Sequence, residues 1–302
     1  MTHNTTEPTL LRNRLPALLL ILSTSACVAV GDDADPITPR DHEHVASELT
    51  EAVASATEIW DAACPHTPLH GLCVDFARVE PTAGCGPRML GNLRVGARSE
   101  PEVARAHEAF DDALEATTAQ EPTDPVARAA VRNAMGRAQI AKIDAEFETY
   151  LAMTIDVPGL GAPDATLEDP AMLATFRTAF EAKVHAGNDL AVAYAALRDT
   201  DDPESLVRGA LRTTWAMVHV IDEVMSMAVP GDRRTAEARK DYCDALHEST
   251  ATAVATSLGT AQWCVETAHK RGYAGPEVAQ CQALVHLLEA RGRASKPASR
   301  DG

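Results

Sequence analysis

Four residues in the first third of the chain combine the two side-chain types that zinc prefers. Cys64, His66, His70 and Cys73 lie within ten residues of one another. Thiolate and imidazole groups bind Zn²⁺ in tetrahedral sites, so this set could hold one ion. The competing interpretation joins the two thiols in a disulfide, as an oxidising compartment would, and leaves the histidines on the surface. We predict no metal and keep zinc at these four residues as the alternative.

Further histidine and carboxylate side chains share helix faces and could gather around iron in a helical bundle. They are His219 with Asp222 and Glu223, Asp244 with His247, and Glu266 with His269. A di-iron bundle needs two Glu-x-x-His helices and two further inward glutamates, and only Glu266 to His269 has that spacing. We interpret these residues as caps and solvated faces, with His219 hydrogen-bonded in the core.

The sequence carries no recognisable catalytic motif. It contains no Gly-rich phosphate loop, no nucleophile elbow and no metalloprotease helix. We therefore predict that the protein has no catalytic residues and is not an enzyme.

The N-terminal segment has the layout of a secretory signal. Arg12 and Arg14 precede an apolar run at residues 15–22, and small or polar residues then lead to Cys27. The run is too short for a bilayer, which needs ~20 apolar residues. An ordinary signal peptidase could cut after Ala26, but Cys27 stands where bacterial lipoproteins carry acyl chains. We expect lipidation at Cys27, with the exported protein on the outer membrane, at its periplasmic face or at the cell surface.

Setting Cys27 aside leaves an even number of cysteines in an oxidising compartment. Three lie early and three lie late: Cys64, Cys73, Cys85, Cys243, Cys264 and Cys281. Because each group is odd, complete pairing requires at least one bond between the two ends of the chain. We predict Cys264 with Cys281, two early cysteines with each other, and Cys243 with the remaining early one. The alternative leaves Cys243 as a buried free thiol.

Composition narrows the class of protein and the partners. The net charge is -17 and only 4% of residues are aromatic. An acidic surface repels phosphate backbones and anionic lipid headgroups, so we exclude nucleic acid as a partner and expect membrane contact only through the N-terminal lipid. Few aromatic residues and many alanines favour closely packed helices over a sheet-rich fold.

Helical periodicity predicts the elements that must position these side chains. The expected helices cover about 44–64, 18 residues from 103, a long seam after Pro170, a buried central helix at 206–229, and a hairpin of 235–270 and 277–290. Three helices should begin at Asp124-Pro125, Asp169-Pro170 and Asp202-Pro203, where the carboxylate caps a helix that opens with proline. Residues 65–100 read as an irregular cysteine-containing loop, with a strand considered only at 73–79.

Several short cysteine motifs carry a resemblance. They are Gly71-Leu72-Cys73, Cys85-Gly86-Pro87, Tyr242-Cys243-Asp244, Trp263-Cys264-Val265 and Ala279-Gln280-Cys281. In order and spacing they resemble tetratricopeptide-repeat-type envelope proteins of gliding, predatory Gram-negative bacteria, over roughly residues 55–291. The resemblance implies an all-helical protein used for assembly or scaffolding, with no catalytic residues.

The repeat itself is degenerate in this chain. Ala106, Phe110, Ala113 and Leu114 match the second helix of a tetratricopeptide unit, but the proline expected at Thr118 comes at Pro122. We therefore expect an all-α array of long antiparallel helical hairpins without a regular period.

The expected organisation is a signal peptide at 1–26, an acidic tether at 27–42, a helical domain at 43–292 and a disordered tail at 293–302. We expect an exported, lipid-anchored helical scaffold that binds other envelope proteins. The alternative function is a periplasmic metal-binding or redox-active helical protein.

Overall fold

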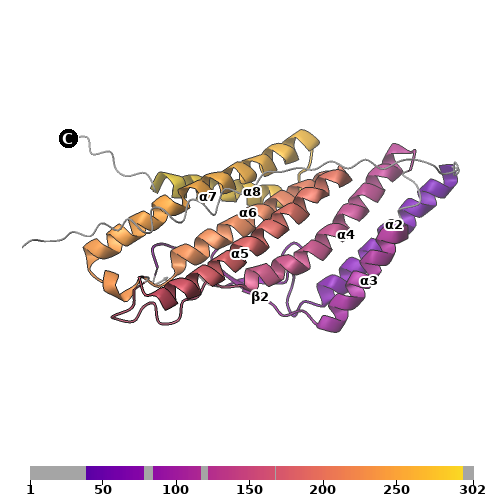
Figure 1. Ribbon diagram of the computed structural model, residues 1–302. Coiled ribbons are helices and arrows are strands. Elements are labelled where there is room, and N and C mark those ends of the chain that lie inside the picture. The colour runs from indigo at the N-terminus through magenta and orange to yellow at the C-terminus, as the bar shows by residue number, and fades with distance from the viewer. Residues whose placement is uncertain (1–38, 78–83, 117–121, 167, 295–302) are drawn as a thin grey trace, which may run out of the picture.

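The fold is all-α, as the sequence predicted. A computed structural model describes residues 39–77, 84–116, 122–166 and 168–294 (Figure 1). The predicted signal peptide at 1–26, Cys27, most of the tether and most of the tail lie outside the described residues. Within the described part, no helix combines the length and apolar character needed to cross a membrane.

Seven α-helices and one two-stranded sheet form the described chain. The helices are α2 Pro39–Ala62, α3 Glu100–Ala116, α4 Pro125–Ala152, α5 Pro170–Ala196, α6 Pro203–Ser226, α7 Ala236–Arg271 and α8 Pro276–Ala294. The strands are β1 Val74–Ala77 and β2 Asn92–Val95, and short 3-10 helices lie at η1 Leu197–Thr200 and η2 Gly231–Arg233.

Three helices begin at the Asp-Pro pairs, as predicted. The aspartate oxygens accept backbone N–H groups from Ala127 (2.7 Å, to Asp124), Ala171 (2.8 Å, to Asp169) and Ser205 (2.8 Å, to Asp202). Proline at the next position has no N–H group to leave unpaired, so both residues of each pair favour a helix start.

Helix α6 is the central element and packs against α4, α5, α7 and α8 (Figure 1). Buried residues make up 17 of its 24 positions, which confirms the predicted central helix. It ends at Ser226, before the expected end at Val229. Helices α2 and α3 pack on each other and on α4, at the far edge of the molecule from α7.

Helices α7 and α8 also pack on each other and are joined by a short turn. Gly272 ends α7 with a φ of 67°, a left-handed conformation that a residue with a Cβ adopts only at a cost. The predicted helix boundaries, Lys270 and Glu277, lie one residue from the observed ones. The finer prediction of a tetratricopeptide-like hairpin array stays a prediction.

The buried residues form two separate clusters. The first, which we call the α6 core, joins α4–α8 and the β1 region through residues such as Phe147, Leu211, Trp215 and Cys264. The second, the alanine core, joins α2, α3 and the first half of α4. Its members are Ala46, Leu49, Val53, Ala56, Trp60, Ala106, Phe110, Ala113, Ala127, Val131, Ala134, Ala138 and Ala141.

Residues 65–100 are more regular than predicted. Strand β1 falls in the considered segment, but β2 was not predicted and pairs with it antiparallel, from Val74 opposite Val95 to Ala77 opposite Asn92. Leu72 and Val74 are buried in the α6 core, and this packing orders the segment. Four-residue strands are too short for an alternating pattern to be recognised in the sequence.

Two helices extend beyond the residues that the sequence predicted for them. Helix α2 begins at Pro39, inside the expected tether, since proline suits a first helical turn. Helix α8 continues to Ala294, inside the expected tail. Basic residues in the last turn of α8, Arg291 and Arg293, favour this extension because they complement the negative end of the helix dipole.

Candidate functional site

The six cysteines lie in three pairs at bonding distance. The S–S distances are 2.07 Å for Cys64–Cys73, 2.05 Å for Cys85–Cys243 and 2.03 Å for Cys264–Cys281. This arrangement matches the predicted set: two early cysteines together, the third with Cys243, and one pair between α7 and α8. Cys85 is thereby joined to a residue 158 positions away, which ties the N-terminal loop to α7.

An imidazole lies beside the first of these pairs. His66 Nδ1 is 3.5 Å from Cys64 Sγ, and His66 Nε2 is 3.9 Å from Cys73 Sγ. The three ligand atoms lie within 4.8 Å of one another. Cys73 is fully buried, whereas His66 is half-buried, so the cluster lies just beneath the surface.

The predicted zinc set of four is not brought together, because His70 lies elsewhere. Its Nδ1 is 3.8 Å from Glu277 Oε1, and its Nε2 contacts the amide nitrogen of Gln280, both on α8. The backbone explains this: His70 has a φ of 51° and is followed by Gly71 at 82°, so the chain reverses and the imidazole turns toward α8. Arg212 donates to the His70 carbonyl at 2.6 Å and holds the turn.

The predicted face of His219, Asp222 and Glu223 is buried, but its carboxylates bind loops. Asp222 accepts the N–H groups of Met89 and Leu90 at 2.7 and 2.8 Å. Glu223 accepts the N–H group of Ile155 at 3.0 Å and pairs with Arg88 at 2.8 Å. Burial raises the pKa of Asp222 to about 6, although the two backbone bonds oppose the rise.

His219 lies in the core, as predicted. Its ring is buried, and within the described chain its Nδ1 has no hydrogen-bond partner. Burial, with Lys183 and Arg88 nearby, lowers its pKa to about 3. The ring packs against Tyr150 at a centroid distance of 6.0 Å.

The carboxylates of the remaining predicted pairs lie on solvated faces, as interpreted, whereas His247 is half-buried and its Nδ1 is buried. Asp244 pairs with Lys240 at 2.5 Å, and Glu266 pairs with Lys270 at 3.9 Å, with all four side chains well exposed. Because both carboxylates are turned outward, neither pair directs a carboxylate into the bundle.

Buried ion pairs that we did not predict fix the same loop region. Arg212 pairs with Asp144 at 3.1 Å, and Arg98 pairs with Glu148 at 2.8 Å. Glu148 also accepts the N–H group of Cys73 at 2.6 Å. A signal was present: charged residues interrupt the apolar faces of α4 and α6, but a helical pattern alone does not say which loop they bind.

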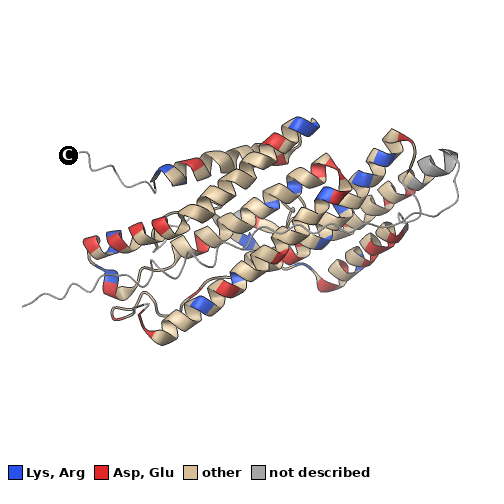
Figure 2. Cartoon of the chain, turned by 45° about the horizontal axis from the view of Figure 1, so that its top comes forward, with Lys and Arg blue, Asp and Glu red and all other residues tan. Residues whose placement is uncertain are grey.

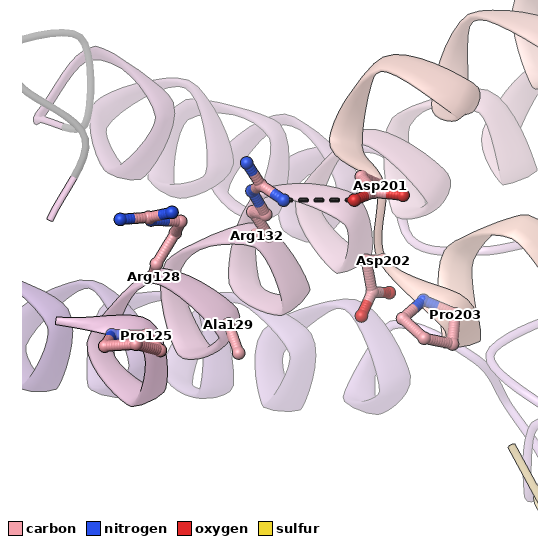
Figure 3. Close-up of a pocket in the computed structure, with 7 residues that line it drawn as sticks. All are labelled: Pro125, Arg128, Ala129, Arg132, Asp201, Asp202 and Pro203. Atoms are coloured by element: carbon pink, nitrogen blue, oxygen red, sulfur yellow. Dashed lines mark hydrogen bonds and ion pairs between the residues drawn. The ribbon is translucent and has the colours of Figure 1, made fainter. Parts of the chain in front are cut away.

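A second exposed feature lies where α4 and α6 begin and α7 ends. Arg132 and Arg271 both pair with Asp201, at 3.1 and 2.8 Å, and Arg198 lies 5.5 Å over the ring of Trp263. Arg128, Arg132 and Asp201 line a hollow of about 240 Å³. Figure 3 shows Arg132 between the other two, directed toward Asp201. We call this surface the arginine–tryptophan face; its members are Arg128, Arg132, Arg198, Trp263 and Arg271.

Asp201 organises this face through an unusual backbone. Its φ is 49°, in the left-handed region that aspartate tolerates better than most residues. Its N–H group donates to the Arg198 carbonyl and ends η1. The turn therefore presents one carboxylate to arginines from two different helices.

Comparison with protein-family models, with curated proteins and with solved structures finds no match for this chain.

Proposed function

We propose that the protein is an exported, lipid-anchored helical scaffold that binds other envelope proteins through the arginine–tryptophan face. The observation that carries the proposal is the 38% exposure of Trp263, a large ring beside the cation of Arg198. Tryptophan and arginine are enriched at the residues that dominate binding energy in protein interfaces.

The charge of this face supports a partner of particular chemistry. Four arginines gather there in a chain whose net charge is -17, and Asp201 pairs with two of them. A partner segment with carboxylates and a small apolar side chain would complement both the cations and the indole ring. Trp263 also lies in a stretch of α7, residues 249–265, without charged side chains (Figure 2). Such a stretch costs less to desolvate than one that carries charged side chains.

The rigidity of the molecule supports the same function. Three disulfides and the buried ion pairs fix the helices relative to one another. A surface that is ordered before binding loses less conformational entropy on association. The interior charges bind each other or backbone groups, which suits a support for a surface better than a reaction centre.

The anchor is tested separately from the face. Cys27→Ser should release the protein from membranes, because acyl chains at that thiol are its expected attachment. Membrane fractionation of the two forms measures this. A Cys27→Ser protein that stays in the membrane fraction contradicts lipid anchoring.

The face is tested by affinity capture from solubilised envelopes, with the captured proteins quantified by mass spectrometry. The double variant Trp263→Ala with Arg198→Ala should capture at least tenfold less of a partner than the parent chain does. The matched control is Leu287→Ala with Arg293→Ala, which also removes one exposed apolar and one basic side chain. These control residues lie 11 and 17 positions into α8, about 17 and 26 Å along its axis. Equal loss in both variants, or loss in neither, contradicts this face as the contact surface.

A second candidate function, metal binding or redox activity, is favoured by one observation. His66 lies at hydrogen-bond distance from a cystine sulfur, and a histidine in that place can bind a metal or stabilise a thiolate.

A further inference from the structure

The cluster of Cys64, His66 and Cys73 combines groups that can undergo redox change and bind metal, which a scaffold does not require. We propose that reduction of the Cys64–Cys73 disulfide converts this cluster into a three-ligand site for Zn²⁺, with the fourth position open to a water molecule or an external ligand. The proposal does not depend on the arginine–tryptophan face or on the lipid anchor.

The distances within the cluster suit a tetrahedral ion. With zinc–sulfur and zinc–nitrogen bonds near 2.3 and 2.0 Å, a tetrahedral site separates nitrogen from sulfur by about 3.5 Å and the two sulfurs by about 3.8 Å. One ring nitrogen already lies near both sulfurs: His66 Nε2 is 3.9 Å from Cys64 Sγ and 3.9 Å from Cys73 Sγ. This nitrogen must move about 0.4 Å nearer to each sulfur, and the two sulfurs must move apart. Breaking the bond allows this because the sulfurs then repel to a non-bonded distance.

The backbone of Gly96 lies close to the cluster. A Cβ at Gly96 would lie 2.7 Å from Cys73 Sγ and 2.8 Å from His66 Nε2. Gly96 is not among the positive-φ residues, so its conformation does not require glycine. The missing side chain instead lets the β2 end approach the sulfur and the imidazole closely, and Gly96 N–H donates to the Cys73 carbonyl at 2.7 Å.

The ligand count is three because nearby candidates are engaged elsewhere. His70 contacts Glu277 and Gln280 on α8. The Glu148 carboxylate accepts hydrogen bonds from Cys73 N–H and from Arg98. Three protein ligands with an open fourth position are the arrangement that lets zinc exchange a ligand.

The proposed conversion balances as two steps. A dithiol reductant gives two electrons and two protons to the Cys64–Cys73 bond, which yields two thiols while the reductant becomes a disulfide. Zn²⁺ then displaces one proton from each thiol, and neutral His66 supplies the third bond through a ring nitrogen. For re-oxidation, an external disulfide takes two electrons from the two thiolates and two protons from solvent and becomes a dithiol, while the Cys64–Cys73 bond re-forms and Zn²⁺ is released.

The other two disulfides provide an internal contrast. Among the described residues, only the Cys64 cluster brings three metal-ligating groups together. The neighbour of Cys264 Sγ is instead the backbone carbonyl of Val207, at 3.5 Å. A backbone carbonyl is not among the thiolate, imidazole and carboxylate ligands that zinc prefers. Zinc uptake by the reduced chain should therefore be one equivalent.

The test is metal binding by the full chain, before and after reduction with a phosphine under anaerobic conditions. Zn²⁺ is counted after dialysis, and Co²⁺ serves as a spectroscopic probe of thiolate ligation. The reduced chain should retain one equivalent and the oxidised chain none. His66→Ala should lower the affinity at least tenfold. The control His70→Ala, which removes the fourth residue of the sequence-predicted set, should bind as the parent does.

Several results would overturn the proposal. Binding by the oxidised chain contradicts redox control, full binding by His66→Ala contradicts the ligand set, and loss in His70→Ala restores a four-ligand site. Circular dichroism of each sample follows the fold. A reduced chain that keeps its helices but binds no Zn²⁺ counts against the site. A reduced chain that loses its helices and does not regain them when Zn²⁺ is added also counts against it.

Discussion

The two hydrophobic clusters of this molecule are built on different principles. Eight of the 13 members of the alanine core are alanines, and a buried cation, Arg98, meets this core at the ring of Trp60, 3.7 Å away. The α6 core surrounds Asp144, Arg212, His219, Asp222 and Glu223, all at most 4% exposed. One cluster relies on close approach of helices, whereas the other relies on buried charges that bind loops and one another.

This difference shows what each region requires of its sequence. Alanine packing needs only small residues at helical spacing, so any helix with the same pattern would fit. The α6 core needs named partners: Arg212 must meet Asp144, and Asp222 must meet the N–H groups of residues 89 and 90. Buried charges without partners cost several kcal/mol, so this core tolerates fewer alternative arrangements.

The largest expected effect comes from the bond that ties the loop to the α6 core. Replacing Cys85 and Cys243 by alanine opens a link between residues 158 positions apart. The chain-entropy model gives a loss of about 5 kcal/mol in the free energy of unfolding. Urea unfolding followed by Trp215 fluorescence measures it. Alanines at Cys64 and Cys73, which close only nine positions, should cost about 3 kcal/mol. Equal losses would show that native strain or residual structure dominates instead.

The second prediction compares the two cores by introducing methionine into each of them. Arg212→Met leaves the Asp144 carboxylate buried with Tyr194 as its remaining partner and should cost about 3–5 kcal/mol. Leu49→Met in the alanine core keeps volume and polarity and should cost less than about 1.5 kcal/mol. The free energies of unfolding in urea decide between them. A smaller loss for Arg212→Met would mean that the ion pair does not hold the α6 core.

The pH dependence of stability should also differ between the cores. The pKa of His219 is about 3 in the folded chain and near 6.5 when unfolded, so the unfolded chain binds this proton first as the pH falls. His219 therefore lowers stability as the pH drops from 6.5 toward 3, by a few kcal/mol at most. The groups that face it, Lys183, Arg88 and Tyr150, do not accept its proton.

Asp222 acts in the opposite direction. Its folded pKa of about 6 exceeds the unfolded value of 3.8, so it adds stability as the pH falls through 6. His219→Gln should remove the destabilising contribution and leave that of Asp222, which makes the variant less sensitive to acid than the parent. Urea midpoints at several pH values measure this in chains that keep a single tryptophan, Trp215 for the α6 core or Trp60 for the alanine core. An unchanged acid response at Trp215 contradicts the assignment to His219.

Sequence reasoning recovered the elements that depend on local signals. Asp-Pro starts, apolar periodicity and the Gly272 turn involve residues within a few positions, and these placed the starts of α4, α5, α6, α7 and α8 to within a few residues. The odd numbers of early and late cysteines also constrained the pairing, because counting does not require geometry.

Features that depend on distant contacts were missed. The sequence could not show that His70 would turn to α8, since that rests on a left-handed backbone and on Arg212, 142 residues away. Strand β2 exists because β1 and the α6 core lie beside it. Trp263 and Arg198 meet only because α7 returns past η1.

The smallest expected effects test whether the Asp-Pro motif alone determines how much each helix cap contributes to the free energy of unfolding. Asp124 and Asp169 cap exposed helix starts, so their replacement by alanine should cost about 1 kcal/mol each. Asp202 belongs to the same Asp-Pro motif but is buried, and it also accepts hydrogen bonds from the Ser205 hydroxyl at 2.6 Å and from Asn133 at 3.2 Å. Asp202→Ala should cost about 2 kcal/mol or more, because it leaves buried donors without an acceptor. Thermal unfolding of the three variants compares them directly. Equal losses would mean that the cap alone, and not its place beside the α6 core, sets the energy.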